Sequence, residues 1–151
     1  MYFSEGIVLL DAQALDRTDI LRRMAAEFVR AGKALDSFGP AILAREEKYP
    51  TGLALGELNV AIPHSDAEHV VAPQLGFASL RDPVEFEVMG EPGATTNVSL
   101  IIMLALKKAE DQVPMLQKLM AIIQDADALA GLRAATEASQ VIDIFAAAGI
   151  D

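Results

Sequence analysis

The chain has 151 residues, of which 52% are hydrophobic and none is cysteine, and its formal net charge is −10. This length and apolar content predict one domain over residues 1–151, with its own hydrophobic core. The absence of cysteine excludes a disulfide framework, a thiolate metal site and a cysteine nucleophile. Because nucleic acids and anionic lipid surfaces repel a negatively charged chain, we expect neither as a partner.

The N-terminal part is predicted to start with a short strand at Ile7–Leu10 and to continue as a helix. Over 17–31, apolar residues recur at helical spacing on one face, and Gly32 follows as a residue suited to end a helix. Basic residues are interleaved with the apolar ones, a pattern typical of a solvated helix face: Arg22, Arg23, Arg30 and Lys33.

A second helix is predicted over 37–47, with Asp36 or Ser37 as its N-cap and Pro40 in its first turn. Pro50-Thr51-Gly52 then predicts a turn. The central region that follows is typical of strands, and four apolar runs have the required length: Leu58–Ile62, Leu75–Leu80, Val84–Val88 and Val98–Leu106.

Short connections separate the middle strands, at Arg81-Asp82-Pro83 and at Gly90–Gly93, and they predict antiparallel pairing. The longest apolar run, Val98–Leu106, has nine residues. A helix that crosses a bilayer needs roughly 20, so this run indicates a buried strand. The N-terminus lacks the basic region of a secretory signal, and we expect a soluble, cytoplasmic protein.

The C-terminal third is again helical in pattern. Helices are predicted at 126–134 and 137–147, after a longer helix with one apolar stripe: Val113, Leu116, Leu119, Met120 and Ile123. Methionines at core spacing are expected to be buried: Met103, Met115 and Met120. The order of helices, strands and helices predicts an α/β fold of the α+β type, a three-layer α/β/α sandwich around a small mixed β-sheet.

His64 is the first candidate for chemistry. It stands in Asn59-Val-Ala-Ile-Pro-His-Ser-Asp66, where an apolar strand ends and a polar segment begins. We expect it beside a helix N-terminus, whose N–H groups favour an anion. A neutral imidazole, with an ordinary pKa near ~6.5, is a competent nucleophile and can hold a phosphoryl group. The alternative is a surface or capping histidine without a chemical role.

Arg45 is the second candidate, because it precedes the turn that leads back to the His64 strand. Arginine is the side chain best shaped for bidentate contact with phosphate oxygens. The alternative is an exposed arginine that only the helix dipole stabilises.

His69 follows His64 by five residues. A helix over 65–70 would place both rings on one side, within reach of a shared phosphate. Asp66 and Glu68 could join them as metal ligands, but no known ligand spacing appears, so we expect neither a metal nor a cofactor.

These motifs resemble a known family. Arg45-Glu-Glu-Lys-Tyr-Pro-Thr-Gly-Leu53 and Val60-Ala-Ile-Pro-His-Ser-Asp-Ala-Glu-His69 are similar to the enzyme IIA domains of the sugar phosphotransferase system (PTS), of the fructose/mannitol type. The galactitol-like branch is the most similar. The resemblance extends to Pro83–Gly90, Val98–Leu106 and Met115–Met120, and thus covers nearly the whole chain.

The resemblance implies an enzyme, a phosphotransferase of the cytoplasm with a three-layer α/β/α fold. Such a domain accepts a phosphoryl group from the phosphocarrier HPr on a histidine and passes it to a IIB component. IIB phosphorylates sugar that enters through the membrane component IIC. His64 matches the phosphorylated histidine of the family, and Arg45 matches its phosphate-contacting arginine.

One feature departs from the family. Many members carry a second active-site histidine just before the helix after the last strand, whereas 107–112 contains none here. Either His69 takes the assisting role, or His64 works with Arg45 alone. Two other functions stay open: a nitrogen-type regulatory IIA homologue that acts by phosphorylation-dependent protein binding, and a binding module without phosphoryl transfer. The presence of both Arg45 and His64 favours transfer, because a pure interaction domain needs neither.

Overall fold

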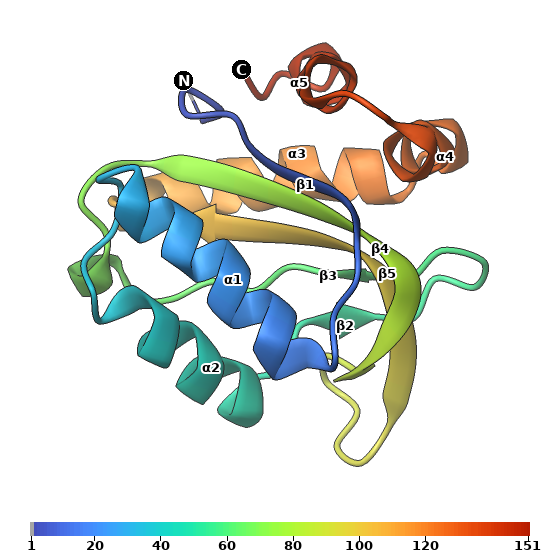
Figure 1. Cartoon of the computed structure of the whole chain (residues 1–151), viewed down its shortest axis with the longest axis horizontal. Helices are drawn as coiled ribbons and strands as arrows, with labels where there is room; N and C mark the ends of the chain where they lie inside the picture. Colours follow the sequence, from blue (N-terminus) through green and yellow to red (C-terminus); the bar gives the residue numbers. More distant parts are fainter. Residues whose placement is uncertain (1) are drawn as a thin grey trace.

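A mixed five-stranded sheet forms the middle layer of the computed structural model, which describes residues 2–151 (Figure 1). The strand order is β1-β4-β5-β3-β2. β1 is parallel to β4 and β3 to β5, whereas the pairs β4/β5 and β2/β3 are antiparallel. The strands are β1 (Ile7–Ala12), β2 (Gly52–Leu53), β3 (Val60–Ala61), β4 (Gln74–Glu87) and β5 (Thr95–Ala105).

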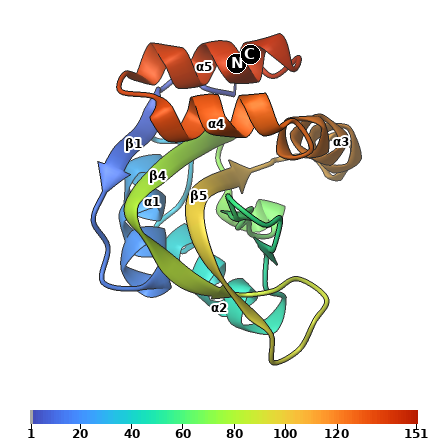
Figure 2. The ribbon, with the colours of Figure 1, turned by 90° about the vertical axis from the view of Figure 1, so that its right-hand side faces the viewer.

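Helices cover both faces of this sheet, so the predicted three-layer sandwich is confirmed (Figures 1 and 2). One face carries α1 (Arg17–Arg30) and α2 (Phe38–Lys48). The other face carries the C-terminal helices α3 (Gln112–Ile123), α4 (Ala126–Ala134) and α5 (Ala138–Ala147). Two short 3₁₀ turns, η1 (Ala67–His69) and η2 (Ala109–Asp111), precede β4 and α3. None of the helices in residues 2–151 has the length and apolar character needed to cross a membrane.

The alternation of side chains along β5 builds both halves of the core, because successive residues of a strand point to opposite faces. Ile101 and Met103 pack into the cluster that contains the buried residues of α1 and α2. Leu100 and Ile102 pack into the cluster that contains those of α3, α4 and α5. β5 is buried on both faces, which explains why its sequence is a continuous apolar run.

β4 differs from the prediction. The sequence predicts two antiparallel strands, Leu75–Leu80 and Val84–Val88, joined by a turn, but the structure has one bent strand. In the pairing with β5, Ser79 lies opposite Leu100 and Val84 opposite Val98, so β4 carries extra residues in a bulge. A bulge bends a strand and tolerates a proline, which has no N–H to donate. The antiparallel pairing predicted across Gly90–Gly93 is confirmed, between β4 and β5.

Shorter elements also differ. Where Pro50-Thr51-Gly52 predicts a turn, Gly52 already belongs to β2, and a Cβ atom there would lie 2.5 Å from the carbonyl oxygen of Glu87. Glycine is therefore needed for this close approach.

α3 is a helix, as its apolar spacing predicts, but the face that it buries differs from the predicted one. Met115 is buried as expected, whereas Met120 is 39% exposed and is not a core residue.

Candidate functional site

The topology brings two loop segments together at one edge of the sheet. β3 and β5 are parallel neighbours, with Val60 opposite Leu100, and His64 continues the pairing through a bridge to Leu104. The segments that follow the two strands therefore emerge side by side. In open α/β sheets, such adjacent carboxyl ends are where binding crevices form.

A pocket of about 220 Å³ opens at this edge. Its lining comes from the last turn of α2, the segment after β3 and the segment after β5: Arg45, His64, Ser65, Asp66, Ala67, Leu106, Lys108, Ala109 and Gln112. A larger hollow of about 570 Å³ lies between α1 and α2, but its lining contains no histidine. Of these two pockets, only the smaller one is lined by a histidine together with cationic side chains, and it is therefore the candidate site.

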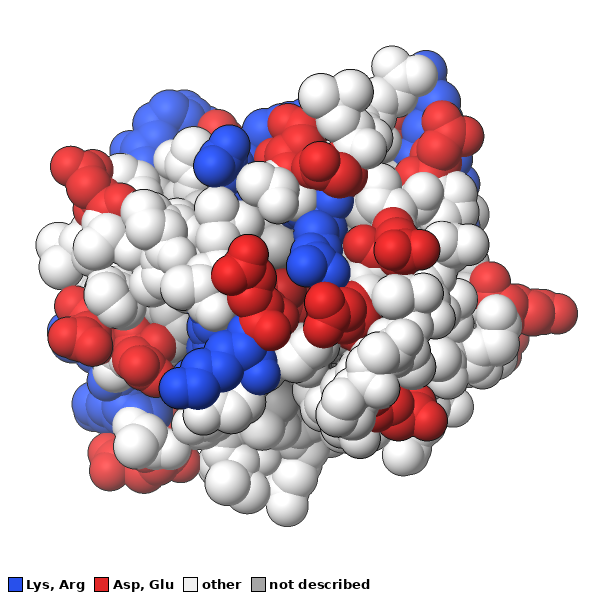
Figure 3. Space-filling view, turned by 90° about the horizontal axis from the view of Figure 1, so that it is seen from below, with Lys and Arg blue, Asp and Glu red and all other residues white. Residues whose placement is uncertain are grey.

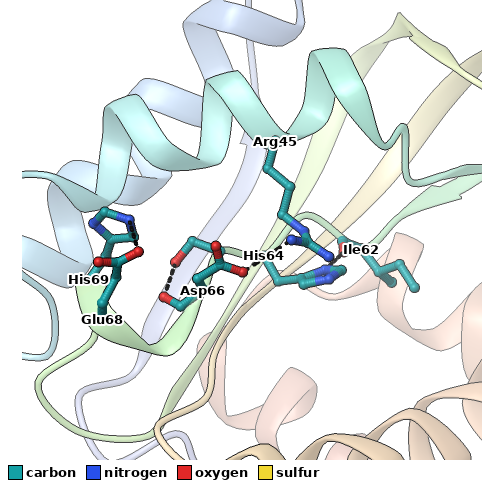
Figure 4. Close-up of polar contacts among 7 residues, drawn as sticks. Arg45, Ile62, His64, Asp66, Glu68 and His69 are labelled. Carbon is teal, nitrogen blue, oxygen red and sulfur yellow. Dashed lines mark hydrogen bonds and ion pairs between the residues drawn. The ribbon is translucent and has the colours of Figure 1, made fainter.

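His64 is half-buried in this pocket, and its Nδ1 lies 3.1 Å from the carbonyl oxygen of Ile62 (Figure 4). A carbonyl oxygen only accepts hydrogen bonds, so Nδ1 carries the proton and Nε2 keeps its lone pair. Burial lowers the pKa of His64 below 6.5, and the positive charge of Arg45 lowers it further. The Ile62 carbonyl and the Asp66 carboxylate act in the opposite direction. The net shift keeps the imidazole neutral near pH 7.

Arg45 reaches from α2 toward His64 and Asp66 (Figure 4). Its Nη1 donates to Oδ1 of Asp66 at 3.2 Å, and the guanidinium carbon lies 5.3 Å from the centroid of the Tyr49 ring. Its Nε is shielded from solvent and, within residues 2–151, has no hydrogen-bond partner. Because buried donors are almost always satisfied, this arginine has hydrogen-bonding capacity that the unmodified protein does not use.

Glu46 and Thr51 fix the end of the helix that carries Arg45. Glu46 is buried, and its carboxylate accepts hydrogen bonds from the backbone N–H and the hydroxyl of Thr51, both at 2.9 Å. These contacts close the loop between α2 and β2. The last turn of α2 is thereby held against the sheet edge where His64 lies.

His69 does not line the pocket, and residues 65–70 do not form the helix on which its contact with a shared phosphate depended. Only Ala67–His69 form a 3₁₀ turn, and Asp66 before it is extended. The His69 ring points away from His64 (Figure 4), and its Nδ1 lies 2.8 Å from Oγ of Ser37. The structure thus brings His64 and Arg45 together but leaves His69 beside the loop before α2.

The helix N-terminus expected next to His64 comes from another part of the chain. Ala109 in η2 and Gln112 at the start of α3 line the pocket, so the helical segment that begins after β5 starts there. Lys108 and Gln112 were not singled out from the sequence. Recognising β3 and β5 as parallel neighbours would have placed the segment after β5 next to His64.

The part of the chain that the structure describes holds no group of three or more His, Cys, Asp or Glu side chains suited to a metal ion.

The surface carries both positive and negative side chains. On the face seen from below, basic side chains are interspersed with acidic ones (Figure 3). Arg22, Arg23 and Arg30 are exposed on α1, as predicted for a solvated helix face, whereas Lys33 lies beyond the end of the helix and is partly buried.

The sequence matches a known protein family and one of its curated members. The family model for "Phosphoenolpyruvate-dependent sugar phosphotransferase system, EIIA 2" matches residues 1–148. The galactitol-specific EIIA component of the PTS of Escherichia coli (strain K12) is 28% identical over 113 residues, which is 75% of each chain.

Two solved structures share the fold. A putative PTS IIA from Streptococcus mutans has a TM-score of 0.82 at 17% identity, over 97% of this chain and 92% of that one. The complex of mannitol enzyme IIA with phosphorylated mannitol enzyme IIB from Escherichia coli gives a TM-score of 0.76 at 22% identity, over 94% and 95% of the two chains.

Proposed function

The chain belongs to the EIIA 2 family of the phosphoenolpyruvate-dependent sugar phosphotransferase system, and from this membership we propose that it carries a phosphoryl group on His64 between a phosphohistidine donor and a IIB component. EIIA components of this system are phosphotransferases that act as phosphocarriers.

One observation carries the assignment to His64: the hydrogen bond from Nδ1–H to the Ile62 carbonyl. It leaves the Nε2 lone pair free, and the lowered pKa of the ring keeps that lone pair unprotonated at neutral pH. Arg45 lies beside the ring with unused hydrogen-bonding capacity. A phosphoryl group on Nε2 would supply oxygen acceptors for the Nε of Arg45, which has none in the unmodified protein.

The transfer step conserves charge and protons. The Nε2 lone pair of His64 attacks the phosphorus of a donor phosphoimidazole that is protonated on its second nitrogen. The N–P bond of the donor breaks, and its electron pair returns to the donor ring, which leaves as a neutral imidazole. His64 becomes the protonated phosphoimidazole, and its Nδ1–H continues to donate to the Ile62 carbonyl, which stabilises the positive ring.

The partners proposed are those of a sugar relay in the cytoplasm. HPr is the donor, a IIB component is the acceptor, and IIB serves the membrane component IIC. The mannitol enzyme IIA of similar fold is seen in complex with its phosphorylated IIB, which supports IIB as the acceptor. The galactitol-specific relative supports galactitol as the sugar whose uptake the relay drives.

The test is reconstitution with enzyme I, HPr and phosphoenolpyruvate. The protein should gain one acid-labile phosphoryl group, and the group should then move to a galactitol-type IIB. A His64→Ala variant that labels as well as the wild type would refute the assignment. A protein that is labelled but passes the group to no IIB would instead act as a regulatory IIA homologue.

A further inference from the structure

Three charged side chains line the His64 pocket before phosphorylation: Arg45, Asp66 and Lys108. His64 is neutral, and the positive charge of Arg45 is paired with Asp66 at 3.2 Å. Among the remaining lining residues, Lys108 alone carries a charge. A phosphoryl group brings about −2, and the protonated ring of phospho-His64 offsets only part of it, so the Arg45–Asp66 pair by itself leaves the phosphorylated pocket with a net negative charge.

Lys108 is free to respond to that charge. It lies in the segment after β5, at the N-cap position of η2, and within residues 2–151 its side chain has no hydrogen bond or ion pair. The neighbouring Lys107 differs, because its Nζ donates to the carbonyl oxygen of Val70 at 2.8 Å. One lysine thus ties the segment to Val70, the residue after η1, while the other lines the pocket.

We infer that Lys108 is a second phosphoryl-binding cation, which contacts the phosphoryl oxygens of phospho-His64 and, together with Arg45, offsets their charge. The inference rests on the proposed function. Lysine acts here as a mobile point charge on a flexible stem, which suits a ligand that arrives and leaves. It also supplies a donor from the segment 107–112, where this chain has no histidine.

The effect of Lys108 is confined to the phosphorylated state. In the unmodified protein, burial, the Ile62 carbonyl, Arg45 and Asp66 account for the shifted pKa of His64. Loss of Lys108 should therefore leave that pKa unchanged while it weakens phosphoryl binding. Replacing a residue with only a structural role would not weaken phosphoryl binding while it leaves the pKa of His64 unchanged.

The experiment compares Lys108→Gln with Lys107→Gln, which removes the same charge one residue away. The wild type and both variants are phosphorylated with HPr, enzyme I and phosphoenolpyruvate, and the equilibrium between phospho-HPr and the phosphorylated chain is measured at low salt. We expect Lys108→Gln to lower this equilibrium constant by about 3- to 10-fold, the range of one exposed charge-assisted contact. Lys107→Gln should change it by less than about 2-fold. Lys108→Arg should restore it, and added salt should shrink the difference.

The outcomes separate the two proposals. If the wild type takes up no phosphoryl group, the proposed function fails and the inference fails with it. If the wild type and Lys108→Gln reach the same equilibrium, only the role of Lys108 is overturned. Equal losses in both glutamine variants would assign the effect to overall charge, and would also overturn it.

Discussion

The carbonyl oxygen of Ile62 lies 3.1 Å from Nδ1 of His64, so the backbone two residues before the histidine decides which ring nitrogen carries the proton. The contact is local, and it depends on the path of the chain from β3 through Pro63. Since a carbonyl cannot donate, the arrangement selects the Nδ1–H tautomer and orients the ring at the same time.

This tautomer predicts the site of phosphorylation within the ring. Nε2 has the free lone pair, so the N–P bond should form there. Nitrogen-15 NMR of the labelled protein should show the unmodified ring protonated at Nδ1, and the phosphorylated ring with its phosphorus coupling at Nε2. A phosphorus coupled to Nδ1 would contradict this reading of the geometry.

The pKa of His64 predicts the pH dependence of transfer. Burial and Arg45 lower this pKa, so the ring keeps its lone pair below pH 6.5 and loses it only as the pH falls through the lowered value. The acid limb of the transfer rate should therefore lie below 6.5. Removing the positive charge in Arg45→Gln should raise the pKa of His64, as NMR titration would show. An unchanged pKa in that variant would place the guanidinium too far away to act on the ring.

Arg45→Lys tests the geometry of the phosphate contact. Lysine keeps the charge but loses the planar fork, so transfer from HPr should slow by about 10-fold, the loss of roughly one charge-assisted contact. The free energy of unfolding should stay close to that of the wild type, because lysine keeps the positive charge beside Asp66 and the side chain lines the pocket rather than the hydrophobic core. Wild-type kinetics in a folded Arg45→Lys protein would remove Arg45 from the site.

The sequence is sufficient to predict the layers of this fold and the order of its helices. Periodicity identifies α1, because this helix buries one clear stripe. The sequence is not sufficient for β4, where Arg81-Asp82-Pro83 has the composition of a turn. Whether such residues make a turn or a bulge depends on β5, the partner strand, which local composition does not describe.

The same limit applies to the site. His64 and Arg45 can be chosen from their residue types, since few side chains in the chain suit phosphoryl chemistry. Lys108 could not, because its role depends on the parallel pairing of β3 with β5, between residues far apart in the sequence. His69 shows the converse: its closeness to His64 in the sequence does not bring the two rings together, because residues five apart lie about 140° apart around an α-helix and most of this segment is not helical.

The position of His69 leads to a prediction of small effect. Its Nδ1 lies 2.8 Å from Oγ of Ser37 and its ring faces away from His64, so His69→Gln should transfer phosphoryl groups within about 2-fold of the wild-type rate, well short of the effect of a positioned acid–base group. The loss of the Ser37 contact should cost about 0.5–1.5 kcal/mol of stability. A larger fall in transfer rate, with stability unchanged, would restore His69 as an assisting residue.

The buried pair of Glu46 and Thr51 predicts a pH-dependent stability. Burial raises the pKa of Glu46, and the hydrogen bonds from Thr51 only partly oppose this. The folded state therefore binds a proton more tightly than the unfolded state, whose pKa is near 4.5. Stability should fall as the pH rises from the unfolded pKa through the raised one, where the carboxylate must be ionised while buried.

Glu46→Gln and Glu46→Ala distinguish this charge from the hydrogen bonds. The amide of glutamine can accept from the Thr51 N–H and has no charge to desolvate, so urea unfolding of Glu46→Gln between pH 4.5 and 7 should show a flatter pH dependence than the wild type. Glu46→Ala leaves the buried N–H and hydroxyl of Thr51 without an acceptor and should lose about 1–3 kcal/mol at each pH. If Glu46→Gln keeps the wild-type slope, another group must titrate in this range, and the ionisation of Glu46 would not explain the pH dependence. If Glu46→Ala is as stable as the wild type, water must satisfy Thr51, and the pair would not be what holds the end of α2 beside His64.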